Sequence, residues 1–495
     1  MFRWLSEEIR AAILDGRFSP GSRLPSRIDL ARKYRLSIGT VVAAFDLLLR
    51  AGYVDAVVGR GTYVSMAAAD TPGERAPPRA RTPRRTLSAR GRLLAAQSFP
   101  DFRSGRAAGT FPLACPMLGV FPIETWNRLA AHRMRGDMHE LAAHGEPLGY
   151  PPLRAAIAKH VGDTRGVRCT SGQVVVTSGT QDSLDLVARL LLDPGDRVWM
   201  EDPGYSPATS LFRAHGLEVI GVPVDARGID CDMGQLTGPA RLAYVTPACQ
   251  FPLGMPMSVE RRVKLLQWGS EMGAWIFEDD YDSQLQFDGR SPPPLYNLDR
   301  ARSVIYSGSF NRMLFPSLRV GFLILPPEFI ESAAAVRSIT RRYRPTLEQA
   351  ILADFIAQGH LELHLGRMRE ICTARRETLI GAARTELGDL MRFDGSQGGL
   401  QLIGWLAPGM SESEAWRRAA ARGIDSVALS SLTISRRMPA ALVLGISGAE
   451  QRAIRTAVKR LGRVLRVLAW QEIGSRGPRR LSAETSIPFE GAKGS

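Results

Sequence analysis

Lysine is scarce in this chain of 495 residues. Its only lysines are Lys33, Lys159, Lys264, Lys459 and Lys493, so arginine carries nearly all of the positive charge. Lysine can present a neutral amine to a carbonyl group because burial readily lowers its pKa, whereas the arginine guanidinium stays protonated. A reaction that needs such an amine therefore has very few residues that could supply it.

Cysteine and long apolar runs are also scarce. The five cysteines lie far apart and form no C-x-x-C pair, which argues against a disulfide framework and against a zinc site. No run of about 18 apolar residues suggests a membrane span. The first residues reach Glu7 and Glu8 too soon for a secretion signal. We therefore expect a cytoplasmic protein.

Acidic residues are outnumbered: 49 Asp and Glu face 64 Lys and Arg, which leaves a net charge of +15. Such a balance favours an anionic partner, most obviously nucleic acid, although an arginine-rich composition also arises without one. With 44% hydrophobic residues the chain is typical of a globular protein. Its length allows two or three domains.

The first 65 residues show the pattern of three helices and a hairpin. Residues 4–15 place Leu5, Ile9, Ala12 and Ile13 on one helical face. Two further helices are predicted after the capping residues Ser26 and Ser37. Two β-rich runs then flank a turn at residues 59–61. This order predicts a winged helix-turn-helix.

The stretch LPSRIDLARKYRLSIGTVVAAFDLLLRAGYVDAVVGRGTYV closely resembles the DNA-binding domain of the GntR family of bacterial regulators. The resemblance covers about residues 3–65 and implies binding to double-stranded DNA. Members of that family commonly carry arginine where Ile28 and Ile38 stand here, so we expect weakened or altered specificity, with apolar surface available to a thymine methyl group. The residues expected to contact DNA are Ser26, Arg27, Arg35, Ser37, Thr40, Arg60 and Gly61.

The composition divides the chain into four parts. We expect a DNA-binding domain over residues 1–66, a Pro- and Arg-rich linker over 67–106, a large domain over 107–468 and a disordered tail over 469–495. The arginines of the linker either add attraction to DNA or belong to a merely solvated tether.

The large domain alternates short apolar runs with helical segments. Seven runs, from VVVTSG at residue 174 to VGFLILP at residue 320, predict a mostly parallel sheet of an α/β domain with helices on both faces. Ligands of such sheets lie beyond the carboxyl ends of the strands. We therefore expect the functional residues just after these runs.

The segments VVVTSGTQDSLDLVARLLLDPGDRVWMEDPGY, YVTPACQFPLG, WIFEDDYDS and YSGSFNRMLFPSLRVGFLILP strongly resemble fold-type I aminotransferases, over about residues 108–465. Together with the amino-terminal part, the chain resembles a MocR/GabR-type transcription regulator. The resemblance implies a pyridoxal phosphate-dependent transferase fold with a smaller C-terminal α+β subdomain, a domain that senses an effector, and a homodimer.

The resemblance also assigns a role to each cofactor-binding residue. The phosphate would be held by residues 179–181, Ser309 and Arg319. Tyr205 would stack on the ring, Asp279 would pair with the ring nitrogen and keep it protonated, and Tyr281 would bond the phenolic oxygen. The full expected set is Gly179, Thr180, Gln181, Tyr205, Gln250, Asp279, Tyr281, Ser309, Arg312 and Arg319.

Arg312 stands where that family has the lysine that joins the cofactor covalently. A guanidinium stays protonated and its lone pairs are delocalised, so it cannot form the imine. Three hypotheses follow. The first is a DNA-binding regulator that holds pyridoxal phosphate or a related amino-acid-like or anionic ligand without a covalent bond and without turnover. The second is an aminotransferase-type enzyme with an appended winged helix, and the third is a decayed regulator that acts as an interaction protein.

Overall fold

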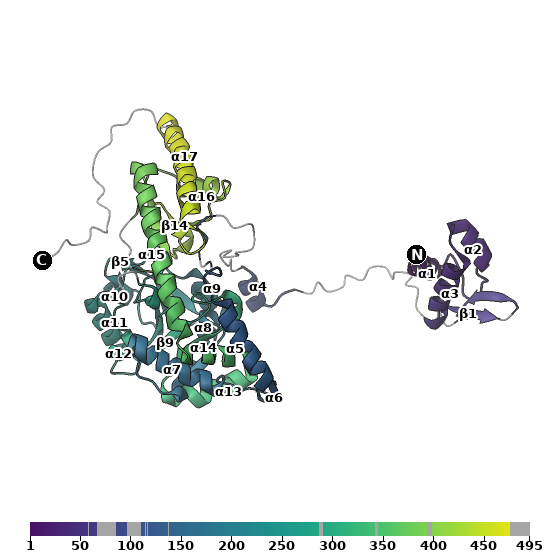
Figure 1. Cartoon of the computed structure of the whole chain (residues 1–495), viewed down its shortest axis with the longest axis horizontal. Coiled ribbons are helices and arrows are strands. Elements are labelled where there is room, and N and C mark those ends of the chain that lie inside the picture. The colour runs from purple at the N-terminus through teal and green to yellow at the C-terminus, as the bar shows by residue number, and fades with distance from the viewer. Residues whose placement is uncertain are drawn as a thin grey trace. The chain divides into compact units, whose positions relative to one another are not determined.

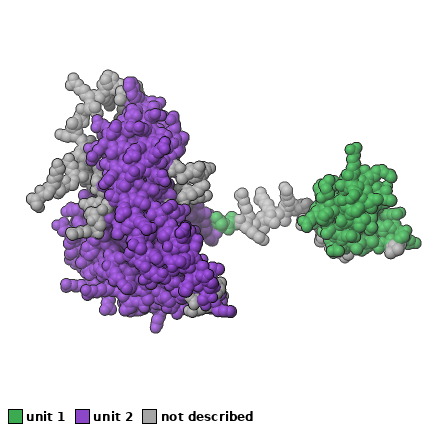
Figure 2. All heavy atoms as spheres, viewed as in Figure 1, with its two compact units in different colours: residues 1–87 green, residues 88–495 purple. Residues whose placement is uncertain are grey.

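The computed structural model describes residues 1–57, 59–66, 86–96, 110–113, 115, 117–136, 138–286, 291–341, 345–393 and 398–475. These residues form two compact units, Met1–Leu87 and Ser88–Ser495 (Figures 1 and 2). Each unit has a hydrophobic core of its own.

The small unit is the predicted winged helix-turn-helix. Its helices are α1 (Phe2–Leu14), α2 (Arg27–Tyr34) and α3 (Ile38–Arg50), and strands β1 (Val54–Val57) and β2 (Gly61–Val64) form an antiparallel hairpin. The buried residues of α1 are the four predicted from the helical period, Leu5, Ile9, Ala12 and Ile13. Leu5, Ile9 and Ile13 share one core with Val41, Phe45 and Leu48 of α3, so the hydrophobic period correctly predicted the buried side of α1.

Much of the segment predicted to be a linker lies outside the described residues. Within it, Ala89–Ala96 form a helix, α4, which has no buried residue. At the other end, the last helix continues past the predicted boundary at residue 468, to Ser475. The remainder of the predicted tail lies outside the described residues.

The large unit contains an eight-stranded sheet with the strand order β3-β10-β9-β8-β7-β4-β5-β6. Strands β4, β5, β7, β8 and β9 are parallel, whereas β10 is antiparallel to both of its neighbours. All seven predicted strands are present. The strands are β3 (Val174–Thr177), β4 (Arg197–Asp202), β5 (Glu218–Asp225), β6 (Gly228–Ile229), β7 (Leu242–Val245), β8 (Trp275–Asp279), β9 (Val304–Ser309) and β10 (Gly321–Ile324).

Both faces of this sheet are buried, because alternate residues of a strand enter different cores. On β3, Val174 and Val176 belong to one hydrophobic cluster and Val175 to another. The covering helices are α5 (Ile123–Gly136), α6 (Met138–Leu141), α7 (Pro151–Arg165), α8 (Thr180–Leu191), α9 (Ser206–Ala214), α10 (Cys231–Gln235), α11 (Val259–Met272), α12 (Leu295–Leu298), α13 (Ile330–Thr340) and α14 (Leu347–Ala357). A sheet covered on both sides leaves its strand ends as the place for a ligand.

A second, antiparallel sheet builds the C-terminal part of the large unit. It consists of β11 (Met391–Phe393), β12 (Gln401–Leu406), β13 (Val427–Ala428) and β14 (Ala441–Gly445). The accompanying helices are α15 (His360–Glu386), α16 (Glu412–Ala420) and α17 (Gln451–Ser475), and α15 and α17 lie side by side (Figure 1). Among the described residues, no helix combines the length and the apolar character needed to span a membrane.

Candidate functional site

A pocket of about 240 Å³ opens at the ends of the strands of the large sheet. The loops after β3, β4, β8 and β9 reach it, as the parallel topology predicts. Gln401 of β12 also lines it, so the pocket joins the two sheets of the large unit. The expected cofactor-binding residues that line it are Gly179, Thr180, Gln181, Tyr205, Asp279, Tyr281, Ser309, Arg312 and Arg319.

One wall of the pocket is the start of α8. Gly179 precedes this helix with a φ of +113°, and a Cβ at this position would lie 2.5 Å from Asn311 Nδ2. Glycine is therefore needed both for the backbone conformation and for the close approach of the next loop. The free N–H groups and the dipole at a helix start favour an anion. Arg319, in the left-handed conformation with a φ of +53°, lines the same pocket.

Asp279 ends β8 as a carboxyl group buried within the wall. It accepts a hydrogen bond of 2.7 Å from the hydroxyl of Tyr244 and one of 3.5 Å from that of Thr180. Burial raises the pKa of Asp279 to about 7, although the bond from Tyr244 lowers it. In its ionised form this carboxylate would accept a hydrogen bond from a protonated ring nitrogen, and the positive charge of such a partner would offset the burial that raises the pKa.

Arg312 projects from the loop after β9 and has internal partners. Its Nη2 lies 3.2 Å from Asp282 Oδ2 and donates a 3.1 Å hydrogen bond to Gln401 Oε1. The guanidinium carbon stands 5.2 Å from the ring centre of Tyr281, a cation–π distance. Its Nε is buried and has no hydrogen-bond partner among the described residues. Arg312 thus keeps one donor free while its charge is balanced by Asp282.

Gln250 lies behind the pocket rather than in its lining. Its Nε2 donates to the carbonyl oxygens of Phe251, at 2.7 Å, and Pro203, at 2.9 Å, and its Oε1 accepts from the N–H of Leu253. The neighbouring Cys249 accepts a weak hydrogen bond of 3.7 Å from the hydroxyl of Tyr281, and burial raises the pKa of the Cys249 thiol to about 12. Both residues therefore shape the loop that supports Tyr281 and Phe251.

Several lining residues were not predicted from the sequence. Tyr244 points from the interior of a strand, and Asn311 lies inside the recognised loop, where its side chain bonds the carbonyl of Ser178 at 3.1 Å. Gln401 comes from a sheet far along the chain. A two-residue period identifies which strand residues are buried but does not show which of them face a cavity, so only Asn311 had a local signal.

The described lysines lie outside the pocket lining. Lys159 on α7 pairs with Asp163, Lys264 on α11 pairs with Asp232, and Lys459 is on α17. Lys33 belongs to the small unit, and Lys493 falls beyond the described residues. The four described lysines thus lie on helices and not in the loops that form the pocket.

In the small unit, the two predicted caps are formed. Ser26 accepts a hydrogen bond from the backbone N–H of Asp29, and Ser37 accepts one from that of Thr40. The hydroxyls of Ser37 and Thr40 also lie 2.8 Å apart. These two serines therefore set the start of α2 and of α3, whatever contacts they make with DNA.

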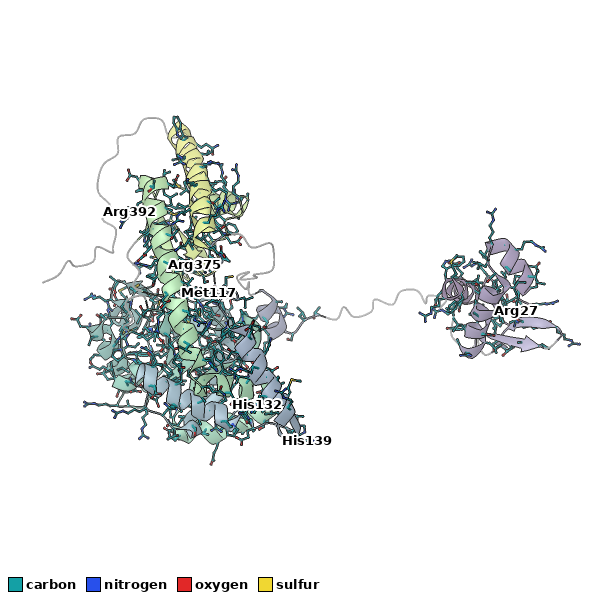
Figure 3. All side chains as sticks on the ribbon, in the orientation of Figure 1. Arg27, Met117, His132, His139, Arg375 and Arg392 are labelled. Atoms are coloured by element: carbon teal, nitrogen blue, oxygen red, sulfur yellow. The ribbon has the colours of Figure 1, made fainter. Side chains whose placement is uncertain are left out.

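Arginines flank these helix starts. The guanidinium carbon of Arg27, a residue labelled in Figure 3, lies 5.7 Å from the ring centre of Phe45, and Arg35, the residue after α2, has the left-handed conformation. Arg60 stands exposed in the turn of the hairpin. Next to it, Gly61 has a φ of +114°, and a Cβ there would lie 2.8 Å from Arg23 Nε, so glycine is needed at this point of the wing.

Ile28 and Ile38 are exposed on the same two helices. Their relative exposures are 58% and 55%, which is large for isoleucine at the first or second position of a helix. The surface next to the caps is thus partly apolar, with cations around it.

The sequence matches known families in both units. Residues 4–64 match the model of bacterial regulatory proteins of the gntR family, and residues 119–461 match that of aminotransferase class I and II. The chain is 37% identical over 462 residues to the probable rhizopine catabolism regulatory protein MocR of Rhizobium meliloti, covering 93% of each chain. It is 33% identical to the transcriptional regulator TauR of Rhodobacter capsulatus, covering 83% of this chain and 84% of that one.

Among solved structures, the α-aminoadipate aminotransferase LysN of Thermus thermophilus superposes with a TM-score of 0.68 at 27% identity, over 78% of this chain and 96% of that one. Fold and matched families together define a helix-turn-helix transcription regulator with an aminotransferase-type domain. The chain belongs to the MocR-type regulators, and the regulator hypothesis is thereby favoured over the enzyme hypothesis.

Proposed function

We propose that this chain regulates transcription in response to a small anionic or amino-acid-like ligand, which the pocket holds without a covalent bond and without turnover. The observation that carries the proposal is the environment of Arg312. Its guanidinium is balanced by Asp282 and stacked on Tyr281, so it is built into the pocket as a fixed cation. A fixed cation binds a carboxylate or phosphate but does not act as a nucleophile.

The pocket residues fit pyridoxal phosphate as the ligand or as part of it. The start of α8 and Arg319 offer donors and positive charge to a phosphate. Tyr205 offers an aromatic face to the ring, and Asp279 would hold a proton at the ring nitrogen. When bound, pyridoxal phosphate supplies an aldehyde that reacts with primary amines and a ring that withdraws electrons.

Ligand binding would be coupled to the arrangement of the two sheets. Arg312 bonds Gln401 of β12, and Asp282 accepts a hydrogen bond of 3.2 Å from the N–H of Leu400. A ligand carboxylate would compete with Asp282 and Gln401 for Arg312, whose Nε is still unpaired among the described residues. A ligand that favours one arrangement of these groups over another changes the state of the domain, which sensing requires.

A reduction experiment tests the covalent part of the proposal. The full chain is mixed with pyridoxal phosphate, treated with borohydride and mapped by peptide mass, and binding is measured separately by equilibrium dialysis. We expect saturable binding without a reduced adduct in the pocket. Arg312→Lys should gain an adduct at that position, whereas Arg436→Lys, outside the pocket lining, should not. An adduct on a pocket lysine of the unmodified chain would refute noncovalent binding.

We further propose that the small unit binds operator DNA through Arg27, Arg35, Arg60 and the starts of α2 and α3. The exposed cations suit phosphates, and the apolar Ile28 and Ile38 suit thymine methyl groups. A mobility shift on the DNA upstream of the chain's own gene, at several salt concentrations, tests this. Absence of any sequence preference would favour the decayed-regulator alternative.

We propose a homodimer as the working form, because two copies of a helix-turn-helix bind two half-sites with a spacing that the protein symmetry sets. Sedimentation equilibrium of the full chain tests the stoichiometry, and a monomer at the concentrations that bind DNA would contradict it.

A further inference from the structure

Helix α17 carries a row of cations on its exposed side. Residues Arg452, Arg455, Lys459, Arg463 and Arg466 are all exposed, at successive spacings of three or four residues. Positions so spaced lie on one side of an α-helix, and 14 residues at 1.5 Å each give the row a length of roughly 21 Å. We call these five residues the α17 basic row.

Little negative charge offsets this row. The stretch from Gln451 to Gln471 contains no Asp or Glu. On the neighbouring α15, Glu386 lies 3.8 Å from Lys459, and its backbone carbonyl accepts a bond from Arg466. On α16, Glu414 is already paired with Arg417 and Arg418. A surface whose charges serve only solubility carries both signs interspersed. The excess of positive charge along this row therefore favours an anionic partner.

The opposite side of α17 holds the helix in the protein core. Ile454, Val458, Leu461 and Leu465 are fully buried, and the helix packs along α15 (Figure 1). The row is therefore presented by a rigid element. A helix that binds a membrane surface inserts its own apolar side into the lipid. In α17 that side is already covered, which favours another polyanion.

We propose that the α17 basic row is a second DNA-binding surface, which binds the sugar-phosphate backbone of duplex DNA without reading its sequence. Duplex DNA carries a phosphate about every 1.7 Å of helix axis when both strands are counted, so a row of roughly 21 Å has enough phosphates along its length to pair with its five cations. Four of the five cations are arginines, whose planar guanidinium pairs with phosphate in two-point fashion. The inference rests on the DNA binding proposed above and adds a binding surface on the large unit.

Salt-dependent binding of the full chain tests the inference. The variant Arg455→Gln/Lys459→Gln/Arg463→Gln removes three charges and keeps good helix formers on an exposed surface. The control Arg168→Gln/Arg213→Gln/Arg300→Gln removes three exposed charges elsewhere in the same unit. Fluorescence anisotropy on a duplex of several helical turns, with and without the operator, gives the slope of log K against log salt. Circular dichroism verifies that both variants are folded.

We expect the row variant to lower the magnitude of that slope by about 2 to 3, since each phosphate that the protein neutralises accounts for about 0.9. Its affinity for operator and for unrelated DNA should fall by the same factor, because the row does not read sequence. The control variant should match the unmodified chain.

Equal behaviour of the two variants would overturn the inference while leaving the proposed function intact. Failure of the unmodified chain to bind DNA would overturn both. Binding of anionic phospholipid vesicles that depends on the row, with an unchanged DNA slope, would overturn the inference by assigning the row to membranes instead.

Discussion

Arg312 in the pocket and Ile38 at the start of α3 are both residues that the resemblance to known families singled out, and their surroundings differ. The Arg312 side chain is 19% exposed and has an anion, an amide and an aromatic ring as neighbours. Ile38 is 55% exposed. The pocket has its interactions arranged before a ligand arrives, whereas the side chain of Ile38 lies on a surface that only a binding partner would cover. Substitutions in the pocket should therefore mainly change the free energy of unfolding. Substitution of Ile38 should mainly change the preference among DNA sequences.

The largest effect is expected where the pocket loses the counter-charge of Arg312. Asp282→Ala leaves a largely buried guanidinium without its anion, and we expect the large unit to lose about 3 kcal/mol of unfolding free energy. Calorimetry of the full chain measures this. The single variant Arg312→Gln and the double variant Asp282→Ala/Arg312→Gln complete a double-mutant cycle, and the double variant should recover most of the loss, because neither charge then remains. If the effects of the two single substitutions simply add, the two residues are not coupled and their ion pair has no energetic role.

A pH-dependent effect should follow from Asp279. Its pKa is raised to about 7 in the folded chain and is near 4 when unfolded, so the folded state binds the extra proton between these values. The stability that this proton provides is present below about pH 4 and is lost as the pH rises through about 7. Asp279→Asn, without ligand, should flatten that decline by a few kcal/mol, since one pKa unit corresponds to about 1.4 kcal/mol.

Urea unfolding of the large unit at a series of pH values from 4 to about 8 measures this slope. Glu201 and Glu278 also have pKa values raised to about 7 by burial, so part of the decline should remain in the variant. An unchanged slope in Asp279→Asn would show that Asp279 is ionised throughout.

A smaller effect is expected at the start of α3. Ser37→Ala removes the oxygen that accepts from the Thr40 N–H and should cost the small unit about 1 kcal/mol. Ser37→Asn, which can cap the helix in the same way, is the matched control and should cost far less. Chemical unfolding followed by far-UV circular dichroism compares them. Equal destabilisation of both variants would mean that Ser37 acts through something other than the cap.

The smallest change in stability is expected at Ile38 itself. Ile38→Ala should stay within about 0.5 kcal/mol of the unmodified chain, because the side chain is mostly in water. The preference for particular DNA sequences should change nonetheless, most at thymines. Selection of bound sequences from a random pool measures it, with Leu49→Ala, 45% exposed at the far end of the same helix, as control. An unchanged preference would remove Ile38 from the surface that reads DNA sequence.

The spacing of apolar residues along the sequence predicted most of the fold, because this spacing indicates which side of a helix or strand is buried. Seven apolar runs became seven strands, and four apolar positions of α1 became its buried side. The same patterns did not predict α4, a helix in a stretch of sequence without an apolar period. They also did not show that α17 continues beyond residue 468. A helix without a buried side, such as α4, leaves no hydrophobic period to detect.

The residues of the pocket also fall into those that the sequence predicted and those that it did not. Residues at or just beyond the end of a strand, such as Gly179, Tyr205 and Asp279, line the pocket and were expected there from the rule that ligands lie beyond strand ends. Tyr244 and Gln401 line the same pocket without such a signal, since one points out of a strand interior and the other comes from the C-terminal sheet. Gln250 was expected at the ligand and instead bonds its own loop.

By itself the sequence determined the two folds, the starts of α2 and α3, and the presence of a guanidinium in the loop after β9, because these depend on the period of apolar residues and on the chemistry of single side chains. Only the tertiary structure decided which groups that guanidinium interacts with. Asp282 and Gln401 are 30 and 89 positions away along the chain, and folding brings both within about 3 Å of Arg312. Charge compensation depends on distance in space, which no local pattern encodes.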